Sequence, residues 1–424
     1  MKKRGIIHGS LNIALAWALL YGTAATSCSK SATPESLASS PSTANVLSDA
    51  RLPEHAERLA KIAFEAGSKF PNVPHAKNKA RVQVLVVETC ATVGLFKSGM
   101  AMAERIEGWQ QGIAMAHLST ALARTNGRVE ALVPLARAEA IASTQNPTFF
   151  TQEWQRDRIK AGIAETLVYL GRDADAKSFE SNLQPSEADR SLKSRAEKCA
   201  TEQMEETEAR IDAAMASGHF DRIRPAIDAY VALSRRVADQ PTKVNAIEAK
   251  VRSVVATFPS SARFDAFAAL ASAAIERKDS QRAAKLIEDA GGAIPPQSLL
   301  TEERIPLLAR IVILKHRNGD AAGAIEGIQT MRSMFAAKRD YIVDIYRASA
   351  LRGIAEAAYQ IGMRDVALEI WGKALEEGTT NVNSRPRADD LAATCCSMIR
   401  SGAIPSQSIL DRADAILKGL SDPW

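Results

Sequence analysis

The chain has 424 residues, of which 24% are charged and only 5% are aromatic. Its formal net charge is +5, but Lys2, Lys3 and Arg4 precede a predicted export segment, and without them 51 basic residues face 49 acidic ones, a net charge of +2. This balance excludes the strongly basic surface that a nucleic-acid partner would require, so we expect no nucleic acid.

Residues 1–27 predict a signal peptide. MKKRG is a short basic segment, LNIALAWALLY is an apolar run, and GTAATSC ends the segment in small residues. The apolar run is too short to span a membrane comfortably and has the flanks of a secretory signal, although an uncleaved N-terminal anchor is the alternative. We therefore expect an exported bacterial protein.

The segment Ala25-Thr26-Ser27-Cys28 resembles a bacterial lipobox, in which the cysteine is lipidated after cleavage. It departs from the usual pattern, which has leucine at the place of Ala25 and Gly or Ala at the place of Ser27. Residues 28–48 are rich in Ser, Thr, Ala and Pro, as expected of a flexible tether. The resemblance implies lipidation at Cys28 and, since Ser29 is not a retaining aspartate, an outer-membrane protein that faces the periplasm. A soluble periplasmic protein is the alternative.

Residues 49–424 predict an all-α fold. Between Arg156 and Phe179, for example, Ile159, Ile163 and Leu167 recur every four residues and form one face of a helix. No run alternates apolar and polar residues for long enough to indicate a strand. The irregular segment 182–199 is the predicted position of a hinge.

Helical hairpins are predicted from a series of turn positions. Gly or Asn suits such positions because it closes a helix in a left-handed conformation at little steric cost. The largest interval between turns predicts an additional helix near residues 242–258. The candidate turns are Gly94, Asn126, Gly171, Gly218, Lys278, Gly319, Gly362 and Gly402.

The clearest hairpin is Gly353–Gly378, where small residues at Ala355, Ala367 and Ala374 and the large Trp371 stand at fixed offsets from Gly362. This spacing resembles the tetratricopeptide repeat, a helix-turn-helix unit of about 34 residues, although most intervals here are nearer 40. The resemblance implies a right-handed superhelical α-solenoid of stacked antiparallel helix pairs. It also implies a scaffold for protein–protein contact with no chemistry of its own.

In tetratricopeptide-like units the first helix of each pair faces the concave surface, which gives a set of candidate partner-binding residues. Tyr and Arg are common interface hot spots, although an ordinary solvated helix face is the alternative for each position. The candidates are Arg158, Glu165, Tyr169, His316, Arg317, Arg352, Glu356, Tyr359 and Gln360.

No catalytic residue, metal ligand or cofactor site is predicted. The chain lacks H-E-x-x-H, G-x-S-x-G and G-x-x-x-x-G-K-[ST], and its six histidines are not spaced as metal ligands. The cysteines at 90, 199, 395 and 396 fit buried apolar positions.

Two functions follow as hypotheses. The first is a non-catalytic envelope scaffold that binds a partner protein or peptide. The alternative is a periplasmic (α/α) toroid enzyme acting on polysaccharide, a class that is also built from helical hairpins. The low aromatic content favours the scaffold, because a sugar cleft is lined with tryptophan and tyrosine.

Overall fold

A computed structural model describes residues 54–125, 127–145, 149–295 and 299–420. The predicted signal peptide, Cys28, the tether and the turn residue Asn126 lie outside the described residues. All described helices belong to one compact unit, residues 46–424. Within the described ranges no β-strand occurs, so the prediction of an all-α solenoid of stacked helix pairs is confirmed.

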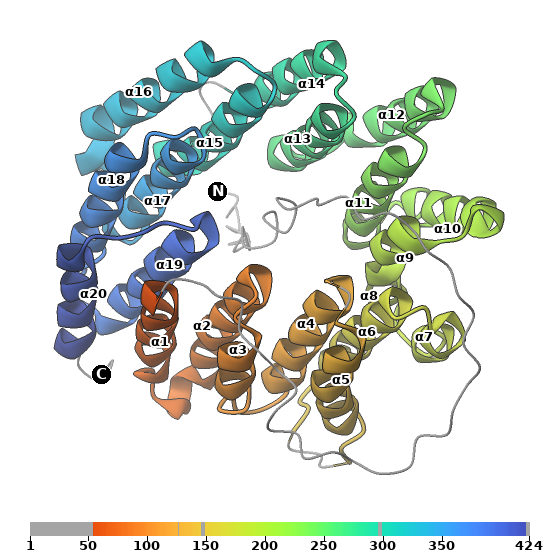
Figure 1. The fold of residues 1–424 in the computed structure, drawn as a ribbon, viewed down its shortest axis with the longest axis horizontal. Helices are drawn as coiled ribbons and strands as arrows, with labels where there is room; N and C mark the ends of the chain where they lie inside the picture. Colours follow the sequence, from red (N-terminus) through yellow and green to blue (C-terminus); the bar gives the residue numbers. More distant parts are fainter. Residues whose placement is uncertain (1–53, 126, 146–148, 296–298, 421–424) are drawn as a thin grey trace, which may run out of the picture. The chain divides into compact units, whose positions relative to one another are not determined.

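The helices of this unit form two layers (Figure 1). Each inner-layer helix packs against the inner helices before and after it. The inner helices are α2 (Asn72–Val93), α4 (Gln110–Arg124), α6 (Glu153–Tyr169), α9 (Leu192–Lys198), α11 (Phe220–Arg236), α13 (Ser260–Glu276), α15 (Thr301–Arg317), α17 (Asp344–Gln360) and α19 (Ser384–Ser401).

The outer helices pack on the inner ones, and four short elements complete the links. The outer helices are α1 (Glu54–Ser68), α3 (Phe96–Ala103), α5 (Arg128–Ala142), α7 (Asp173–Glu180), α10 (Met204–Met215), α12 (Pro241–Val255), α14 (Ser280–Gly292), α16 (Ala321–Lys338), α18 (Arg364–Glu377) and α20 (Gln407–Gly419). The short elements are α8 (Pro185–Ala188), η2 (Asp189–Ser191), η3 (Thr201–Gln203) and η4 (Arg339–Tyr341).

The hairpin of α17 and α18 shows why these residues fold in this way. Gly362 has a φ of 89°, a left-handed conformation that ends α17 without a Cβ penalty. Ala355 and Ala367, on the two helices, are completely buried, as is Trp371. Small side chains let the two helices approach, and the large indole fills the space beside them.

The predicted turns are confirmed wherever the structure describes them. The six glycines among them all have positive φ, and so does Lys278, at 62°. Gly218 differs from the rest because it joins the outer helix α10 to the inner helix α11. The predicted additional helix is present as α12.

The two ends of the array contact each other, which the sequence did not predict. Helix α1 packs against α19 and α20, and α2 packs against α19. Polar contacts join the same ends: Arg81 Nη2 lies 3.3 Å from Asp389 Oδ1, and Arg400 Nη1 donates to Thr89 Oγ1 at 3.2 Å. The contacts between inner helices therefore form a closed circuit from α2 through α19 and back to α2.

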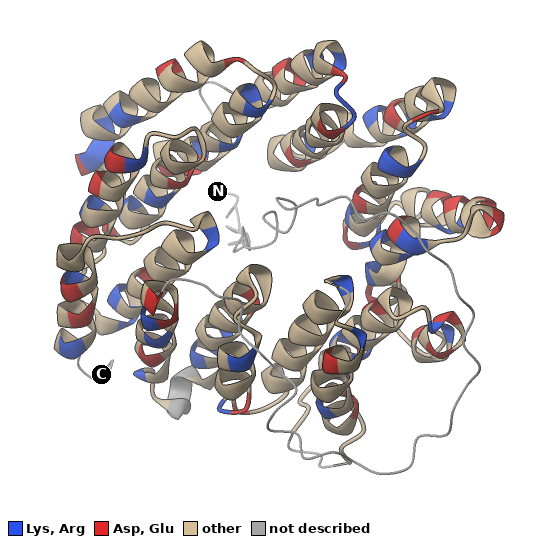
Figure 2. Ribbon diagram, viewed as in Figure 1, with Lys and Arg blue, Asp and Glu red and all other residues tan. Residues whose placement is uncertain are grey.

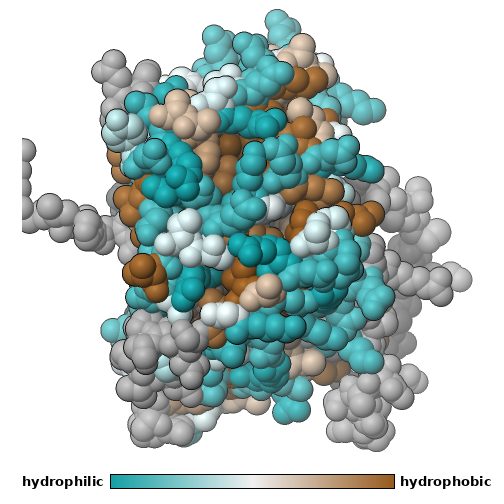
Figure 3. Space-filling view, turned by 90° about the vertical axis from the view of Figure 1, so that its left-hand side faces the viewer, coloured by the Kyte–Doolittle hydropathy of each residue, from teal (hydrophilic) through white to brown (hydrophobic). Residues whose placement is uncertain are grey.

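The surface of the unit is polar and mixed in charge. Basic and acidic residues occur along the same helices and do not gather into regions of one sign (Figure 2). On the side that carries α16, α18 and α20, hydrophilic side chains cover most of the surface and hydrophobic ones lie between them in separate groups (Figure 3). Among the described residues no helix is long and apolar enough to cross a membrane.

Candidate functional site

The predicted partner-binding residues all lie on inner-layer helices. Helix α6 carries three of them, α15 carries two and α17 carries four. Helices α15 and α17 are neighbours, but α9, α11 and α13 separate α6 from α15 in the inner layer. The structure therefore distributes these residues over separate hairpins and does not gather them into one site.

On α17, two of the predicted residues reach the next inner helix. Arg352 Nη1 donates to Asp390 Oδ1 at 2.8 Å, and Glu356 Oε1 lies 3.6 Å from Arg400 Nη2. Both partners belong to α19. These polar groups already join neighbouring hairpins.

Two further predicted residues lie at the end of α17. The hydroxyl of Tyr359 donates to the carbonyl oxygen of Gly402 at 2.9 Å, and its ring lies against Trp371 with 5.7 Å between the centroids. Gln360 is half-buried. Tyr359 therefore also contributes to packing between hairpins.

On α15, Arg317 reaches back to the preceding inner helix. Its Nη1 donates to Ser272 Oγ at 3.1 Å, and its Nη2 lies 3.7 Å from Glu276 Oε1. The adjacent His316 is half-buried.

On α6, two predicted residues make strong contacts with the segment that follows. Arg158 binds Glu187 through two hydrogen bonds, of 2.6 and 2.7 Å, and the buried Tyr169 donates to Glu197 Oε2 at 2.5 Å. Burial, together with the Glu197 carboxylate, raises the pKa of Tyr169 far above its ordinary value. The segment 182–199 is thus attached to α6, and whether it acts as a hinge stays a prediction.

The third predicted residue of α6, Glu165, has a different environment. It is half-buried and makes no hydrogen bond or ion pair with the described residues. Burial raises the pKa of Glu165, and the nearby cations Lys193 and His117 act in the opposite direction. Glu165 is therefore the predicted residue whose carboxylate is not already engaged.

Glu165 belongs to a row of charged side chains on successive inner helices, which we name the charge belt. Starting from α2 the signs alternate, with one residue each from α2, α4, α6, α9 and α11. The five residues are Glu88, His117, Glu165, Lys193 and Asp228. The sequence analysis identified only Glu165 among these, since the others have no motif of their own.

The links of the charge belt are electrostatic. His117 Nε2 lies 2.8 Å from Glu88 Oε1. Lys193 is the leading charge acting on both Glu165 and Asp228. Burial raises the pKa of Asp228, as it does that of Glu165, while Lys193 favours the ionised form of both.

Close approach of α4 and α6 brings His117 and Glu165 near each other. A Cβ at Gly112 would lie 2.5 Å from Ile159 Cδ1, and one at Gly162 would lie 2.8 Å from Ala116 Cβ. A side chain at either position would force its neighbour, Ile159 or Ala116, to shift, so glycine at both positions favours the close approach of the two helices. Small residues at fixed positions thus set the geometry of this part of the belt.

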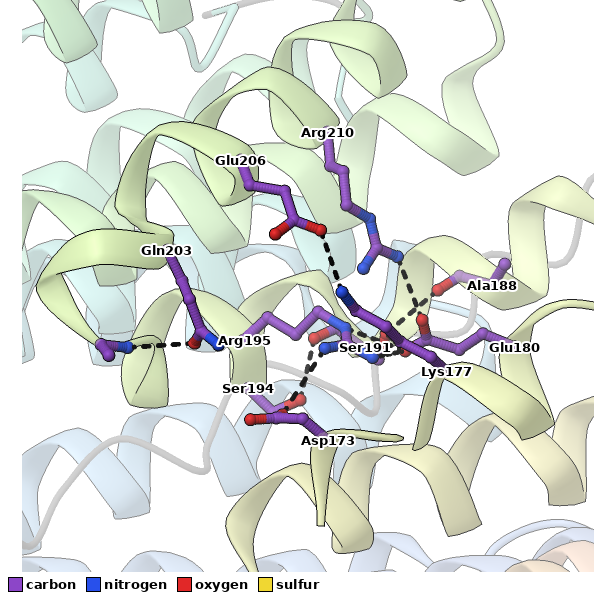
Figure 4. Close-up of polar contacts among 11 residues, drawn as sticks. Asp173, Lys177, Glu180, Ala188, Ser191, Ser194, Arg195, Gln203, Glu206 and Arg210 are labelled. Carbon is purple, nitrogen blue, oxygen red and sulfur yellow. Dashed lines mark hydrogen bonds and ion pairs between the residues drawn. The ribbon is translucent and has the colours of Figure 1, made fainter. Parts of the chain in front are cut away.

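A second charged cluster joins α7, α9 and α10 (Figure 4). Glu180 and Arg195 are both buried, and Arg195 donates to Glu180 Oε1 from Nε at 3.0 Å and from Nη2 at 2.8 Å. Arg210 Nη2 donates to Glu180 Oε2 at 3.2 Å, and Ser191 Oγ donates to Oε1. Every oxygen of this buried carboxylate therefore has a partner.

Beside this cluster lies a small pocket with a volume of about 30 Å³, room for about one or two water molecules. Lys177, Arg195 and Arg210 line it together with Asp173 and Glu206. Lys177 Nζ lies 3.0 Å from Glu206 Oε1, so the charges pair with one another. The arrangement stabilises the junction of the three helices and leaves little unbalanced charge for a ligand.

Exposed apolar side chains gather at two neighbouring links between hairpins. Tyr341 is 83% exposed, Val343 54% and Val382 96%. Asn381 Nδ2 donates to Asp344 Oδ2 at 3.0 Å, which ties the α18–α19 link to the start of α17. We name this surface the linker patch and define it by Tyr341, Val343, Ile345, Tyr346 and Val382.

Metal and thiol chemistry have little support in the described part of the chain. No group of three or more His, Cys, Asp or Glu residues there is placed to hold a metal ion. Cys90, Cys199, Cys395 and Cys396 are buried, as the sequence predicted, and burial raises the pKa of the thiols at 395 and 396.

Comparisons with known proteins do not identify a family. No family model matches the chain, and no curated protein matches it. Among solved structures the chain is similar to Ton1535 from Thermococcus onnurineus NA1, with 12% identity, a TM-score of 0.29, and coverage of 80% of this chain and 94% of that one. A similarity at that score carries no argument about fold or function.

Proposed function

We propose that the protein is a non-catalytic scaffold of the bacterial envelope that binds a partner protein through its helical-repeat surface. The linker patch is the observation that carries this proposal. An exposed group of apolar and aromatic side chains on a soluble domain marks an interaction surface, and tyrosine is enriched among interface hot spots.

The linker patch is favoured over the inner-layer residues because its side chains form no hydrogen bond or ion pair with the described residues, although Lys338 Nζ lies 5.4 Å from the centroid of the Tyr341 ring. Arg158, Tyr169 and Arg352 use their polar groups to join neighbouring helices. Removing such a residue from its internal partner would offset part of any gain from binding. The resemblance of Gly353–Gly378 to the tetratricopeptide repeat supports the same class of function, and this hairpin lies between the two links that form the patch.

Location in the envelope rests on the N-terminal sequence. The basic start, the short apolar run and Cys28 support export followed by lipid anchoring at the outer membrane, with a soluble periplasmic protein as the alternative. The mixed surface charge supports a protein partner and gives no support for nucleic acid.

The proposal is tested by the double variant Tyr341→Ser, Tyr346→Ser, expressed at its native level in the source bacterium. On native gels of gently solubilised envelopes, the wild type should migrate in a complex larger than the isolated chain, and the double variant should migrate as the isolated chain. Val129→Ser is the matched control, because Val129 is 67% exposed on α5, outside the patch. Equal migration of the double variant and the wild type would exclude the patch as the docking surface.

A second candidate, a polysaccharide-active toroid enzyme, is favoured by two observations. The inner helices form a closed circuit of contacts, and Glu165 is a half-buried carboxyl that makes no hydrogen bond or ion pair with the described residues and whose pKa is raised. A raised pKa suits a general acid. Release of reducing ends from envelope polysaccharides by the wild type, and its loss in Glu165→Gln, would support this candidate over the scaffold.

A further inference from the structure

The charge belt has one member that changes charge near neutral pH. Glu88, Glu165 and Asp228 are carboxyl groups and Lys193 is an amine, whereas the ordinary pKa of histidine is about 6.5. His117 is therefore the member whose charge responds to a modest change of pH.

One carboxylate contacts His117 and a second acts on it through its charge alone. Glu88 Oε1, on α2, lies 2.8 Å from His117 Nε2, whereas Glu165, on α6, makes no ion pair with it, and α4 packs against both of these helices. Arg190 in η2 acts against protonation of His117. None of the leading electrostatic influences on His117 comes from α3 or α5, which also pack against α4.

The balance of these influences favours the imidazolium. Burial by itself would lower the pKa of His117, but the Glu88 carboxylate, helped by Glu165, outweighs burial and the repulsion from Arg190, so the pKa of His117 lies above its ordinary value. In the protonated state the signs along α2, α4 and α6 alternate. In the neutral state the positive charge that attracts Glu88 and Glu165 is lost.

We propose that the charge belt is a pH-sensitive conformational device, in which the imidazolium of His117 holds α2 to α4 through Glu88 and attracts the carboxylate of Glu165 on α6, and its deprotonation loosens this part of the inner layer. The proposal does not depend on the identity of any partner. It assigns to His117 a role that no motif in the sequence indicated.

The sign of the pH dependence of stability follows from the direction in which the pKa of His117 is shifted. Because the pKa of His117 is raised in the folded state, its contribution to stability is fully present below the ordinary value of about 6.5 and is lost as the pH rises through the raised value. The raised pKa of Glu165 acts in the same direction, since its ionised form is disfavoured in the fold. The free energy of unfolding should therefore fall as the pH rises past neutrality.

The first experiment is an NMR titration of the histidine side chains in the intact protein. The midpoint for His117 should lie above the ordinary histidine value of about 6.5. In Glu88→Gln the midpoint for His117 should fall. A His117 midpoint at or below the ordinary value, or one unchanged in Glu88→Gln, would overturn the proposal.

The second experiment measures hydrogen exchange in the wild type at pH 6 and pH 8, corrected for intrinsic rates. Protection of α2, α4 and α6 should fall several-fold at the higher pH, while protection of α13 and α15 should change little. His117→Gln should remove this difference between the helices, and His316→Gln should keep it. Equal loss of protection in all five helices of the wild type would contradict a device confined to the belt, and this test does not require any variant to fold.

Discussion

The indole Nε1 of Trp371 in α18 donates a hydrogen bond of 2.9 Å to Oγ of Ser397 in α19. Both side chains are completely buried. Trp371 therefore fills the space in its own hairpin and also binds the next hairpin. The position of this residue relative to Gly362, which identified the repeat in the sequence, thus also helps to determine how neighbouring repeats stack.

This relationship predicts a measurable coupling. Trp371→Phe and Ser397→Ala should each lower the free energy of unfolding, because each leaves the other buried polar group without its partner. The double variant should lose less than the sum of the two, with a coupling of about 1 kcal/mol. Urea unfolding of the four proteins measures this cycle, and strictly additive losses would show that the hydrogen bond contributes nothing.

The buried pair of Glu180 and Arg195 predicts a large effect of a single substitution. Arg195→Ala should cost about 3 kcal/mol, the lower end of the range for a broken buried pair, because Arg210 still contacts Glu180. Lys177→Ala is the control in the same cluster: its side chain is 55% exposed and that of its partner Glu206 60%, so its loss should be much smaller than that of Arg195→Ala. Similar losses for the two variants, measured by urea unfolding, would contradict the distinction between buried and exposed pairs.

Closure of the array is tested by cross-linking across the junction of α2 and α19. A protein with cysteines at Arg81 and Asp389 should be joined by a short bifunctional maleimide, since the native side chains lie 3.3 Å apart. The pair Asp265 and Arg310, which forms an ion pair between the adjacent helices α13 and α15, provides the positive control. Cross-linking of the control pair without any at the junction would mean that the two ends separate in solution.

The proposed lipid anchor at Cys28 predicts where the protein is found in the cell. We expect wild-type protein to stay in the membrane fraction through a salt wash, because several acyl chains on one cysteine give stable anchoring. Cys28→Ser should release the protein or stall its processing while the helical unit stays folded. If the variant fractionates and migrates like the wild type and mass spectrometry finds no acyl group, the protein is not a lipoprotein.

Much of the fold could be predicted because helical hairpins are specified locally. Gly362, Ala355 and Trp371 stand at offsets that determine a turn and a close crossing, and the structure confirms each role. Closure could not be predicted in the same way, because Arg81 and Asp389 are far apart in the sequence and their contact depends on the accumulated geometry of every hairpin between them.

The candidate site was harder to predict than the fold. The geometry of a first helix correctly placed Arg158 and Arg352 in the inner layer, but it could not reveal that their charges are used to join helices. One weak sequence signal pointed to the charge belt. Glu88 and Glu165 each stand six residues before a turn glycine, as does Glu356, which is not part of the belt. Tyr341, Val343 and Val382 of the linker patch lie in links that no periodic pattern describes, and Ile345 and Tyr346 lie at the start of α17.

Docking of a partner protein on the linker patch is the central claim, and site-specific photo-cross-linking in living cells of the source organism tests it most directly. A photoreactive amino acid at Tyr341 and, separately, at Val382 should each capture the same envelope protein, identified by mass spectrometry, because both positions are highly exposed within one patch. The same probe at Val129 should not capture it. Different proteins captured at Tyr341 and Val382, or equal capture at Val129, would contradict the claim.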